Sequence, residues 1–371
     1  MDKLGFGLMR LPLTDPNDAR SVNIPELSEM IDHYLENGFT YFDTAWVYHN
    51  GMSENAVKTA LSSRHDRSSY TVATKLHSGF FNSREDMDNV FNTQLEKMGV
   101  EYFDYYLLHG IEADSVNKYE KFNCFEWMAE KKAAGLIKHA GFSFHASPEI
   151  LEELLTRHPE VEFVQLQINY LDWEHPGIRA RECYEICVKH QKPVFVMEPV
   201  RGGTLAKLPP KAEELMKAAH PDWTIASWAI RFAAGLENVK VVLSGMTHMD
   251  QVVDNVKTMK EMEPLSADDM KVLDRVLEII HATNAISCTG CAYCAPGCPM
   301  NICIPQYFAL YNVDRQEAAD KGWHPQGLYF SNLQKTFGSP ADCIECGQCE
   351  GMCPQHLPII ENLKIVNEYF G

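Results

Sequence analysis

Tyr41-Phe42-Asp43-Thr44-Ala45-Trp46-Val47-Tyr48 is an apolar run that ends in an acid, and a phenol follows five residues after that acid. The pattern is typical of a buried strand that opens into a loop. In a barrel of parallel strands, this end of each strand carries the polar groups around a bound molecule, whereas the strand bodies pack. Asp43 and Tyr48 are therefore candidates for chemistry. Taken alone, an acid near a tyrosine more often forms a structural hydrogen bond in a loop. The rest of the chain therefore decides between a structural and a catalytic role for this pair.

Composition limits the class of protein. The 371 residues are 45% hydrophobic, which allows a large core and predicts one big domain with a smaller one. A net charge of -18 argues against a nucleic-acid partner. No run reaches the roughly 18 apolar residues of a membrane helix, and no signal peptide is recognisable at the start. Twelve cysteines without an export signal indicate a reducing compartment, so we expect a cytoplasmic protein whose thiolates bind metal.

Short apolar runs alternate with amphipathic segments up to about residue 243, which predicts repeated strand-helix units. Eight strands are predicted, at residues 4–8, 39–43, 70–75, 102–109, 137–143, 162–169, 193–197 and 239–244. Predicted helices between them include residues 25–37, 53–64, 83–98 and 147–157. Eight such units match a (β/α)8 TIM barrel. An open doubly wound sheet would show a glycine-rich phosphate turn after its first strand, and Gly5-Phe6-Gly7 is too short for one.

Polar residues lie at the ends of several predicted strands: Asp43, Lys75, His109, Ser143, and Gln165 with Gln167 and Asn169. Residues two apart in a strand share a face, so these side chains point to one rim. Lys75 follows Val72-Ala73-Thr74, and an unpaired ammonium among apolar neighbours is costly. It needs a partner, and Asp43 is the available carboxylate.

Five pieces of sequence, in order, carry a resemblance to a known family: Phe42-Asp43-Thr44-Ala45 with Tyr48, Ala73-Thr74-Lys75, Leu107-Leu108-His109, Gly141-Phe142-Ser143, and Leu243-Ser244-Gly245 leading to Asn255. Over roughly residues 1–280 the chain resembles the aldo-keto reductase superfamily. The resemblance implies a catalytic tetrad of Asp43, Tyr48, Lys75 and His109. Tyr48 would give a proton to the carbonyl oxygen of a small molecule, helped by the Lys75 cation that Asp43 holds in place, and His109 would orient that oxygen.

The same resemblance implies a nicotinamide cofactor held by Ser143, Gln165, Met197, Gly245, Gln251 and Asn255. Ser143 and Gln165 would bond the carboxamide. Met197 stands where the family usually has an aromatic residue stacked on the ring. Gly245 and Gln251 stand where cations usually grip the 2'-phosphate of NADPH. The choice between NADH and NADPH therefore stays open, and a flavin is a further candidate.

After about residue 283 the composition changes abruptly. Cys288, Cys291, Cys294 and Cys298 follow the pattern C-x2-C-x2-C-x3-C-P, and Cys343, Cys346, Cys349 and Cys353 repeat it. Zinc typically uses two separated C-x2-C pairs, whereas this run is the bacterial ferredoxin spacing for [4Fe-4S] clusters. In two-cluster ferredoxins the fourth cysteine of each motif completes the other cluster. Cys298 would then join the second motif's first three cysteines, and Cys353 the first motif's.

These patterns predict a barrel domain at residues 1–283 and a small, mostly α-helical ferredoxin-like domain at 284–371, with helices near 304–311 and 314–321. The leading hypothesis is an oxidoreductase that interconverts a carbonyl and an alcohol, with the clusters linking it to a one-electron partner protein. A hydride carries two electrons and a cluster passes one, so a flavin-bridged, ferredoxin-linked reductase with weak nicotinamide binding is an alternative. A non-catalytic redox-sensing subunit that binds a dinucleotide is another.

Overall fold

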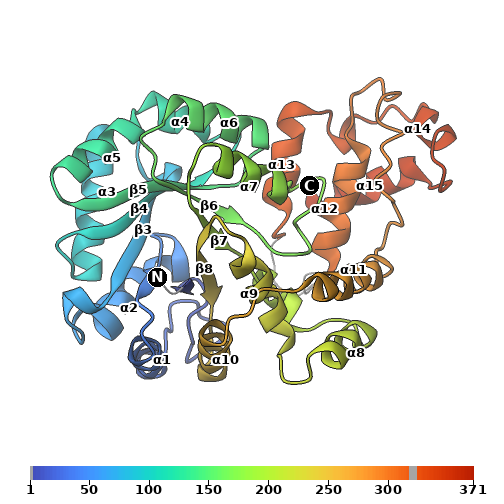
Figure 1. Ribbon diagram of the computed structural model, residues 1–371. Helices are drawn as coiled ribbons and strands as arrows, with labels where there is room; N and C mark the ends of the chain where they lie inside the picture. The colour runs from blue at the N-terminus through green and yellow to red at the C-terminus, as the bar shows by residue number, and fades with distance from the viewer. Residues whose placement is uncertain (1–2, 317–323) are drawn as a thin grey trace.

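The computed structural model describes residues 3–316 and 324–371 (Figure 1). Eight strands close into a parallel barrel in the order of the sequence. Their bounds are β1 Leu4–Gly7, β2 Tyr41–Asp43, β3 Thr71–His77, β4 Phe103–Ile111, β5 Ile137–Phe144, β6 Phe163–Gln167, β7 Val194–Met197 and β8 Val239–Gly245. The predicted (β/α)8 barrel is confirmed, and each predicted strand overlaps an observed one.

Helices surround this barrel. They are α1 Ile24–Glu36, α2 Ser53–Val57, α3 Arg84–Met98, α4 Val116–Lys121, α5 Cys124–Ala133, α6 Pro148–Arg157, α7 Ala180–Lys189, α8 Pro210–Ala219, α9 Ile225–Gly235, α10 Met249–Lys260 and α11 Ala267–His281. Local sequence explains α3, because Ser83 accepts a hydrogen bond from the amide of Asp86 and Gly99 ends the helix with φ 64. The predicted helix 53–64 is divided, since α2 passes into a wider π-helical turn at Lys58–Ser62.

The barrel has a small inner core and a larger outer one. The inner core consists of Tyr41, Ala73, Tyr105, Leu107, Phe163, Phe195, Val241 and Leu243. Successive side chains of a strand alternate between its faces. The residues two positions further along, which include Asp43, Lys75, His109 and Gln165, therefore also face inward, at the carboxyl ends of the strands. The fold itself gathers the predicted polar residues at one mouth.

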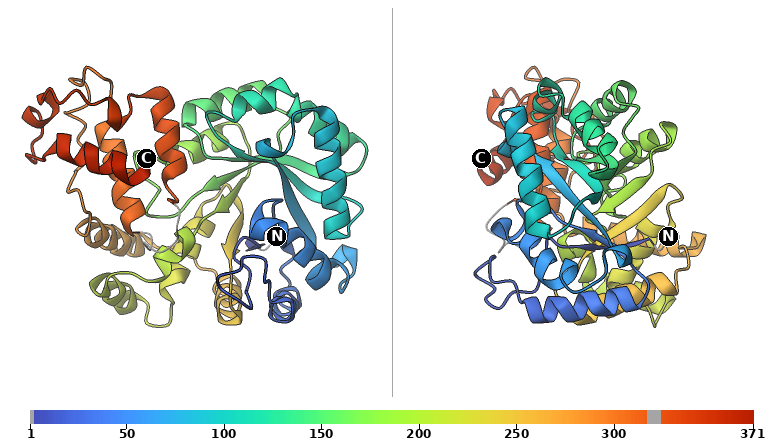
Figure 2. Two further views of the ribbon diagram at one scale, coloured as in Figure 1. Left: turned by 180° about the vertical axis from the view of Figure 1, so that it is seen from behind. Right: turned by 90° about the vertical axis from the view of Figure 1, so that its left-hand side faces the viewer.

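The C-terminal part of the chain is helical, as predicted, and lies beside the barrel in Figure 1 and in the view from behind in Figure 2. It contains α12 Ile304–Gln316, α13 Gly327–Thr336, α14 Gln348–Gly351 and α15 Ile359–Phe370. Of the helix predicted at 314–321, residues 317–321 lie outside the described part, and the earlier residues belong to α12. The boundary predicted after residue 283 stays a prediction, with α11 ending shortly before it. In the described ranges, no helix is both long and apolar enough to cross a membrane.

Helix α13 reaches the barrel mouth. The Nδ2 of Asn332 donates to the backbone oxygen of His145, directly after β5, at 2.8 Å, and its Oδ1 accepts from the amide of Ala113, after β4, at 3.3 Å. Tyr329 donates to the Oε1 of Gln167, the last residue of β6, at 2.9 Å. The C-terminal domain is thus docked on the mouth at β4, β5 and β6.

Candidate active site and cluster cavities

Lys75 is the centre of the candidate active site. Its Nζ lies 2.5 Å from Asp43 Oδ1 and donates to the backbone oxygen of Thr44 at 2.7 Å. The Lys75 side chain is fully buried, and that of Asp43 is 5% exposed. Burial lowers the pKa of Lys75, but the Asp43 carboxylate and the Tyr48 phenol more than offset it, so the pKa lies above its ordinary value. The expected partner of the buried ammonium is present.

Tyr48 and His109 stand beside this pair. Lys75 Nζ lies 5.0 Å from the centroid of the Tyr48 ring, and the Tyr48 and His109 rings meet edge to face at 5.9 Å. Burial raises the pKa of Tyr48, and the nearby Lys75 cation only partly opposes it, so the phenol stays protonated more firmly than the sequence argument assumed. Burial and then Lys75 bring the pKa of His109 well below its ordinary value, which keeps the imidazole neutral.

A buried polar network under β3 fixes the backbone that carries Lys75. Gln94 donates to the oxygen of Lys75 at 2.9 Å and to Glu54 Oε1 at 2.8 Å. Thr74 also donates to Glu54 Oε1, at 2.7 Å, and Lys97 lies 2.6 Å from Glu54 Oε2. Glu54 is fully buried and has donors on both oxygens. Helices α2 and α3 thereby hold the strand end in register.

The predicted carboxamide ligands face the same space. The Nε2 of Gln165 donates to Asp43 Oδ2 at 3.2 Å, so Gln165 borders the tetrad directly. Ser143 Oγ accepts from the amide of Gly110 at 2.7 Å, which leaves its hydroxyl proton for a ligand. Met197 is partly buried and packs on the inner core. These groups suit a flat ring with an amide edge, with the Met197 thioether as an apolar contact.

The predicted cofactor residues at the end of β8 make different contacts in this structure. The Oε1 of Gln251 caps α10 by accepting from the amides of Thr247 and His248 at 2.7 and 3.3 Å. Asn255 is buried and donates to Ser244 Oγ at 2.9 Å. A Cβ on Gly245 would lie 3.2 Å from the side chain of Arg10. The aliphatic part of Arg10 thus lies over Gly245, while its guanidinium lies 3.4 Å from Glu198 Oε1. This arginine near the end of β8 was not predicted from the sequence.

A second buried network lies at the ends of β6 and β7. Asp172 Oδ2 accepts from Gln167 Nε2 at 2.8 Å, from Asn169 Nδ2 at 2.7 Å and from Arg201 Nε at 3.2 Å. Asp172 and Arg201 are almost completely buried. Gln167 and Asn169 were recognisable as inward-facing residues of β6, whereas Asp172 and Arg201 carry no motif of their own.

The eight motif cysteines line two separate cavities. One is lined by Cys298 with Cys343, Cys346 and Cys349, and the other by Cys288, Cys291 and Cys294 with Cys353. The structure thus brings the cysteines together in the crossed-over sets that the ferredoxin resemblance implies. Ile304, at the start of α12, lines both cavities.

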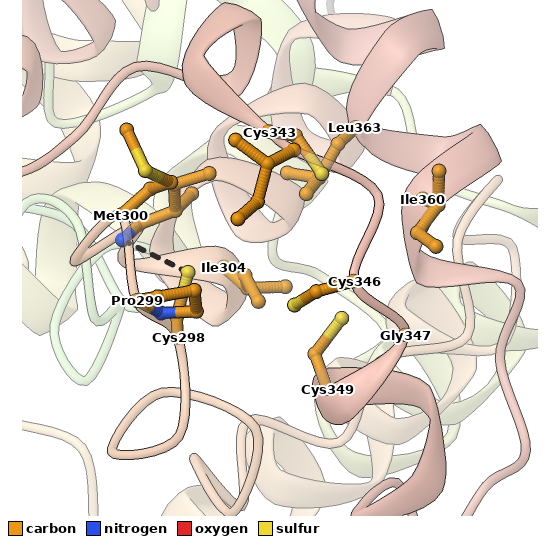
Figure 3. A pocket seen from close by; sticks show the side chains of 12 residues that line it. Cys298, Pro299, Met300, Ile304, Cys343, Cys346, Gly347, Cys349, Ile360 and Leu363 are labelled. Carbon is orange, nitrogen blue, oxygen red and sulfur yellow. Dashed lines mark hydrogen bonds between the residues drawn. The ribbon is translucent and has the colours of Figure 1, made fainter.

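Figure 3 shows the thiols of Cys298, Cys346 and Cys349 around one space, with apolar Ile304 and Leu363 beside them. The amide of Ile302 donates to Cys298 Sγ at 3.5 Å. In the described ranges, no three His, Cys, Asp or Glu side chains converge as ligands of one metal ion would. Four thiols spread around an apolar cavity fit an iron-sulfur cluster better than a single zinc ion.

Comparison with known proteins agrees with the barrel and with the cysteine-rich C-terminal part. The model described as "Aldo/keto reductase family" matches residues 3–278, and that of a "4Fe-4S dicluster domain" matches residues 287–357. An uncharacterized oxidoreductase, YqkF, of Bacillus subtilis (strain 168) is 23% identical over 303 residues, which cover 74% of this chain and 92% of that protein. An aldo-keto reductase of Mycobacterium avium (strain 104) is 26% identical over 253 residues, covering 67% and 81%.

Solved structures share the barrel. Aldo-keto reductase AKR11C1 from Bacillus halodurans in its holo form matches with a TM-score of 0.57 and 26% identity, covering 74% of this chain and 91% of that one. An aldo/keto reductase from Klebsiella pneumoniae in complex with NADP and acetate matches with a TM-score of 0.60 and 19% identity over the same shares. This chain is an oxidoreductase that belongs to the aldo/keto reductase family, with a 4Fe-4S dicluster domain after its barrel.

Proposed function

We propose that this protein reduces a small carbonyl compound with NADH or NADPH at the tetrad of Asp43, Tyr48, Lys75 and His109. The observation that carries the proposal is the buried Lys75 ammonium held between Asp43 at 2.5 Å and the Tyr48 ring at 5.0 Å. A subunit that only binds a dinucleotide has no use for a charge pair at this cost in desolvation. The tetrad favours catalysis over a purely sensing role.

A bound nicotinamide supplies the hydride. The residues of the chain do the rest. Tyr48 holds the proton that the developing alkoxide needs, and Lys75 favours release of that proton because a cation stabilises the phenolate. Neutral His109 donates a hydrogen bond that orients the carbonyl oxygen, and Asp43 keeps Lys75 charged and in place. Ser143 and Gln165 border the position of the ring. Incubation with hydroxyacetone, following NADH and NADPH consumption separately, tests the reaction and the cofactor choice that Arg10, Gly245 and Gln251 leave open.

The pKa values predict a broad pH profile. Carbonyl reduction needs Tyr48 protonated and His109 neutral. The pKa of Tyr48 is raised, so its proton is lost only above about pH 10, and the pKa of His109 is lowered, so its ring gains a proton only well below about pH 6.5. We expect kcat/KM to be flat between about pH 7 and pH 9. If kcat/KM instead falls below about pH 6.5, and this fall disappears in His109→Gln, then His109 has the ordinary pKa of a histidine.

We further propose two [4Fe-4S] clusters in the crossed-over sets. Anaerobic protein should then contain about eight irons, and the variant Cys298→Ser/Cys349→Ser, which damages one cluster twice, should keep about four. The variant Cys349→Ser/Cys353→Ser damages both clusters and should keep far fewer irons. If each cluster were instead bound by the four cysteines of one motif, the second variant would keep more iron than the first. Cys303→Ser, a buried cysteine that lines neither cavity, is the control and should keep all the iron.

The clusters would pass electrons between the barrel and a partner protein, in the reducing cytoplasm that the cysteine content predicts. This link needs a carrier that handles both one and two electrons, which is why a flavin remains the alternative. Extraction of the anaerobic protein decides the point. One flavin per chain, reduced by a low-potential ferredoxin, would favour the flavin-bridged reductase. Unchanged NAD(P)H-dependent turnover after removal of iron would make the clusters structural for this reaction.

A further inference from the structure

His145 lies on the inner face of the barrel one layer above Ser143. Gly141 faces inward, since a Cβ there would meet the Phe163 ring of the inner core at 2.6 Å. Alternation along β5 then turns Ser143 and His145 to the same side. The backbone amide of His145 donates to the backbone oxygen of Ile111 at 2.9 Å. Ile111 is the last residue of β4, the strand that also carries His109. His145 is partly exposed, and a charge on its ring would help to lower the pKa of His109, so the ring lies near the tetrad at the barrel mouth.

The buried network fixes the orientation of Gln167. Asn169 Oδ1 accepts from the amides of Leu171 and Asp172, so its Nδ2 must be the group that faces Asp172 Oδ2. Arg201 Nε meets the same carboxylate. A carboxylate surrounded by donors requires a donor from Gln167 too, which places Nε2 toward Asp172 and Oε1 toward the C-terminal domain.

This orientation fixes the proton on His145. Since Gln167 Oε1 can only accept, the Tyr329 hydroxyl at 2.9 Å must donate to it. Burial raises the pKa of Tyr329 well above its ordinary value, so the hydroxyl keeps this proton. Its oxygen then accepts from His145 Nδ1 at 3.2 Å, which makes Nδ1 the protonated nitrogen.

The other nitrogen of His145 is left as an acceptor. Burial lowers the pKa of His145 to about 4, so the ring is neutral and Nε2 carries a lone pair. Within residues 3–316 and 324–371, Nε2 has no hydrogen-bond partner. Through Gln167 and Tyr329, His145 Nε2 is thus held as a hydrogen-bond acceptor near the tetrad. Tyr48 and His109, by contrast, act there as hydrogen-bond donors.

We propose that His145 Nε2 binds a hydroxyl or N–H group next to the substrate's carbonyl, and that Tyr329 of the cluster domain positions it. The substrate class is therefore a hydroxy- or amino-substituted aldehyde or ketone, and the barrel's site is incomplete without α13. The proposed substrate class rests on the proposed carbonyl reduction. The hydrogen-bond chain from Asp172 to His145 is independent of that reaction.

Hydroxyacetone and butanone form a matched pair, because they have the same size and differ in one hydroxyl. Wild-type protein should prefer hydroxyacetone in kcat/KM by about tenfold, the effect of one hydrogen bond. His145→Phe should abolish this preference, and Tyr329→Phe should reduce it chiefly through KM. The controls are His139→Phe, in β5 on the inward face at the opposite end of the barrel, and Tyr369→Phe, whose hydroxyl donates to Asp314 Oδ1 at 3.0 Å. Equal preference in wild type and His145→Phe would overturn the proposal.

Nitrogen NMR of the cluster-loaded protein, labelled on histidine, separates this proposal from the proposed function. The His145 signals, assigned by their loss in His145→Phe, should show a protonated Nδ1 and a bare Nε2, and hydroxyacetone but not butanone should shift Nε2. A protonated Nε2, or equal shifts from both compounds, would refute the acceptor role even if turnover is normal. The expected shifts without NAD(P)H turnover would uphold it while refuting the reductase.

Discussion

Tyr48→Phe should lower kcat for carbonyl reduction by about 10²- to 10⁴-fold, the usual contribution of a positioned general acid. The substitution removes one oxygen and leaves the ring against His109 and Lys75. The dissociation constant for NAD(P)H should stay unchanged, because the phenol faces the substrate oxygen. Stopped-flow reduction and fluorescence titration of the cofactor measure the two quantities on the same anaerobic preparation.

Tyr170→Phe is the matched control for this prediction. Tyr170 follows β6 at the same end of the barrel, and its buried hydroxyl has no hydrogen-bond partner among the described residues. Its removal should leave turnover and iron content as in the wild type. Full turnover in Tyr48→Phe would show that another group or a water supplies the proton. Losses of equal size in both variants would point to a general disturbance of the mouth.

Local patterns predicted the parts of this protein that depend on short-range rules. Two-residue alternation was enough to place Asp43, Lys75, His109 and Gln165 on one rim, because a closed parallel barrel aligns all strand ends. The cysteine spacing resembles that of two-cluster ferredoxins, and this resemblance was enough to imply which cysteines would meet, although Cys298 and Cys343 are far apart in sequence. In each case the geometry of one motif restricts the fold around it.

Features that depend on how distant segments dock were not predictable. The contact of Tyr329 with His145 joins two domains, and neither residue belongs to a motif. Arg10 lies over Gly245 only because the loop after β1 folds across the end of β8. The pKa of Tyr48 was expected to fall beside Lys75, but the depth of burial, which the sequence does not reveal, has the larger effect.

Lys75→Met should cost the protein both its activity and about 3–5 kcal/mol of stability, because it leaves the Asp43 carboxylate buried without its partner. For a barrel of this size the melting temperature should fall by roughly 6–20 °C. Circular dichroism under anaerobic conditions, on preparations with equal iron content, measures the change.

The double variant Asp43→Asn/Lys75→Met separates the two losses. It removes both charges, and the oxygen of the new amide can still accept from Gln165 Nε2, so no buried group is left ionised. The Thr44 oxygen loses its bond from Lys75 in this variant as it does in Lys75→Met. We expect most of the lost melting temperature to return, while turnover stays as low as in Lys75→Met, since Tyr48 still lacks its neighbouring cation. Recovery of turnover with stability would mean that Lys75 serves only the fold. Failure of stability to recover would mean that the ammonium's bond to the Thr44 oxygen, and not its pairing with Asp43, is what the barrel mouth requires.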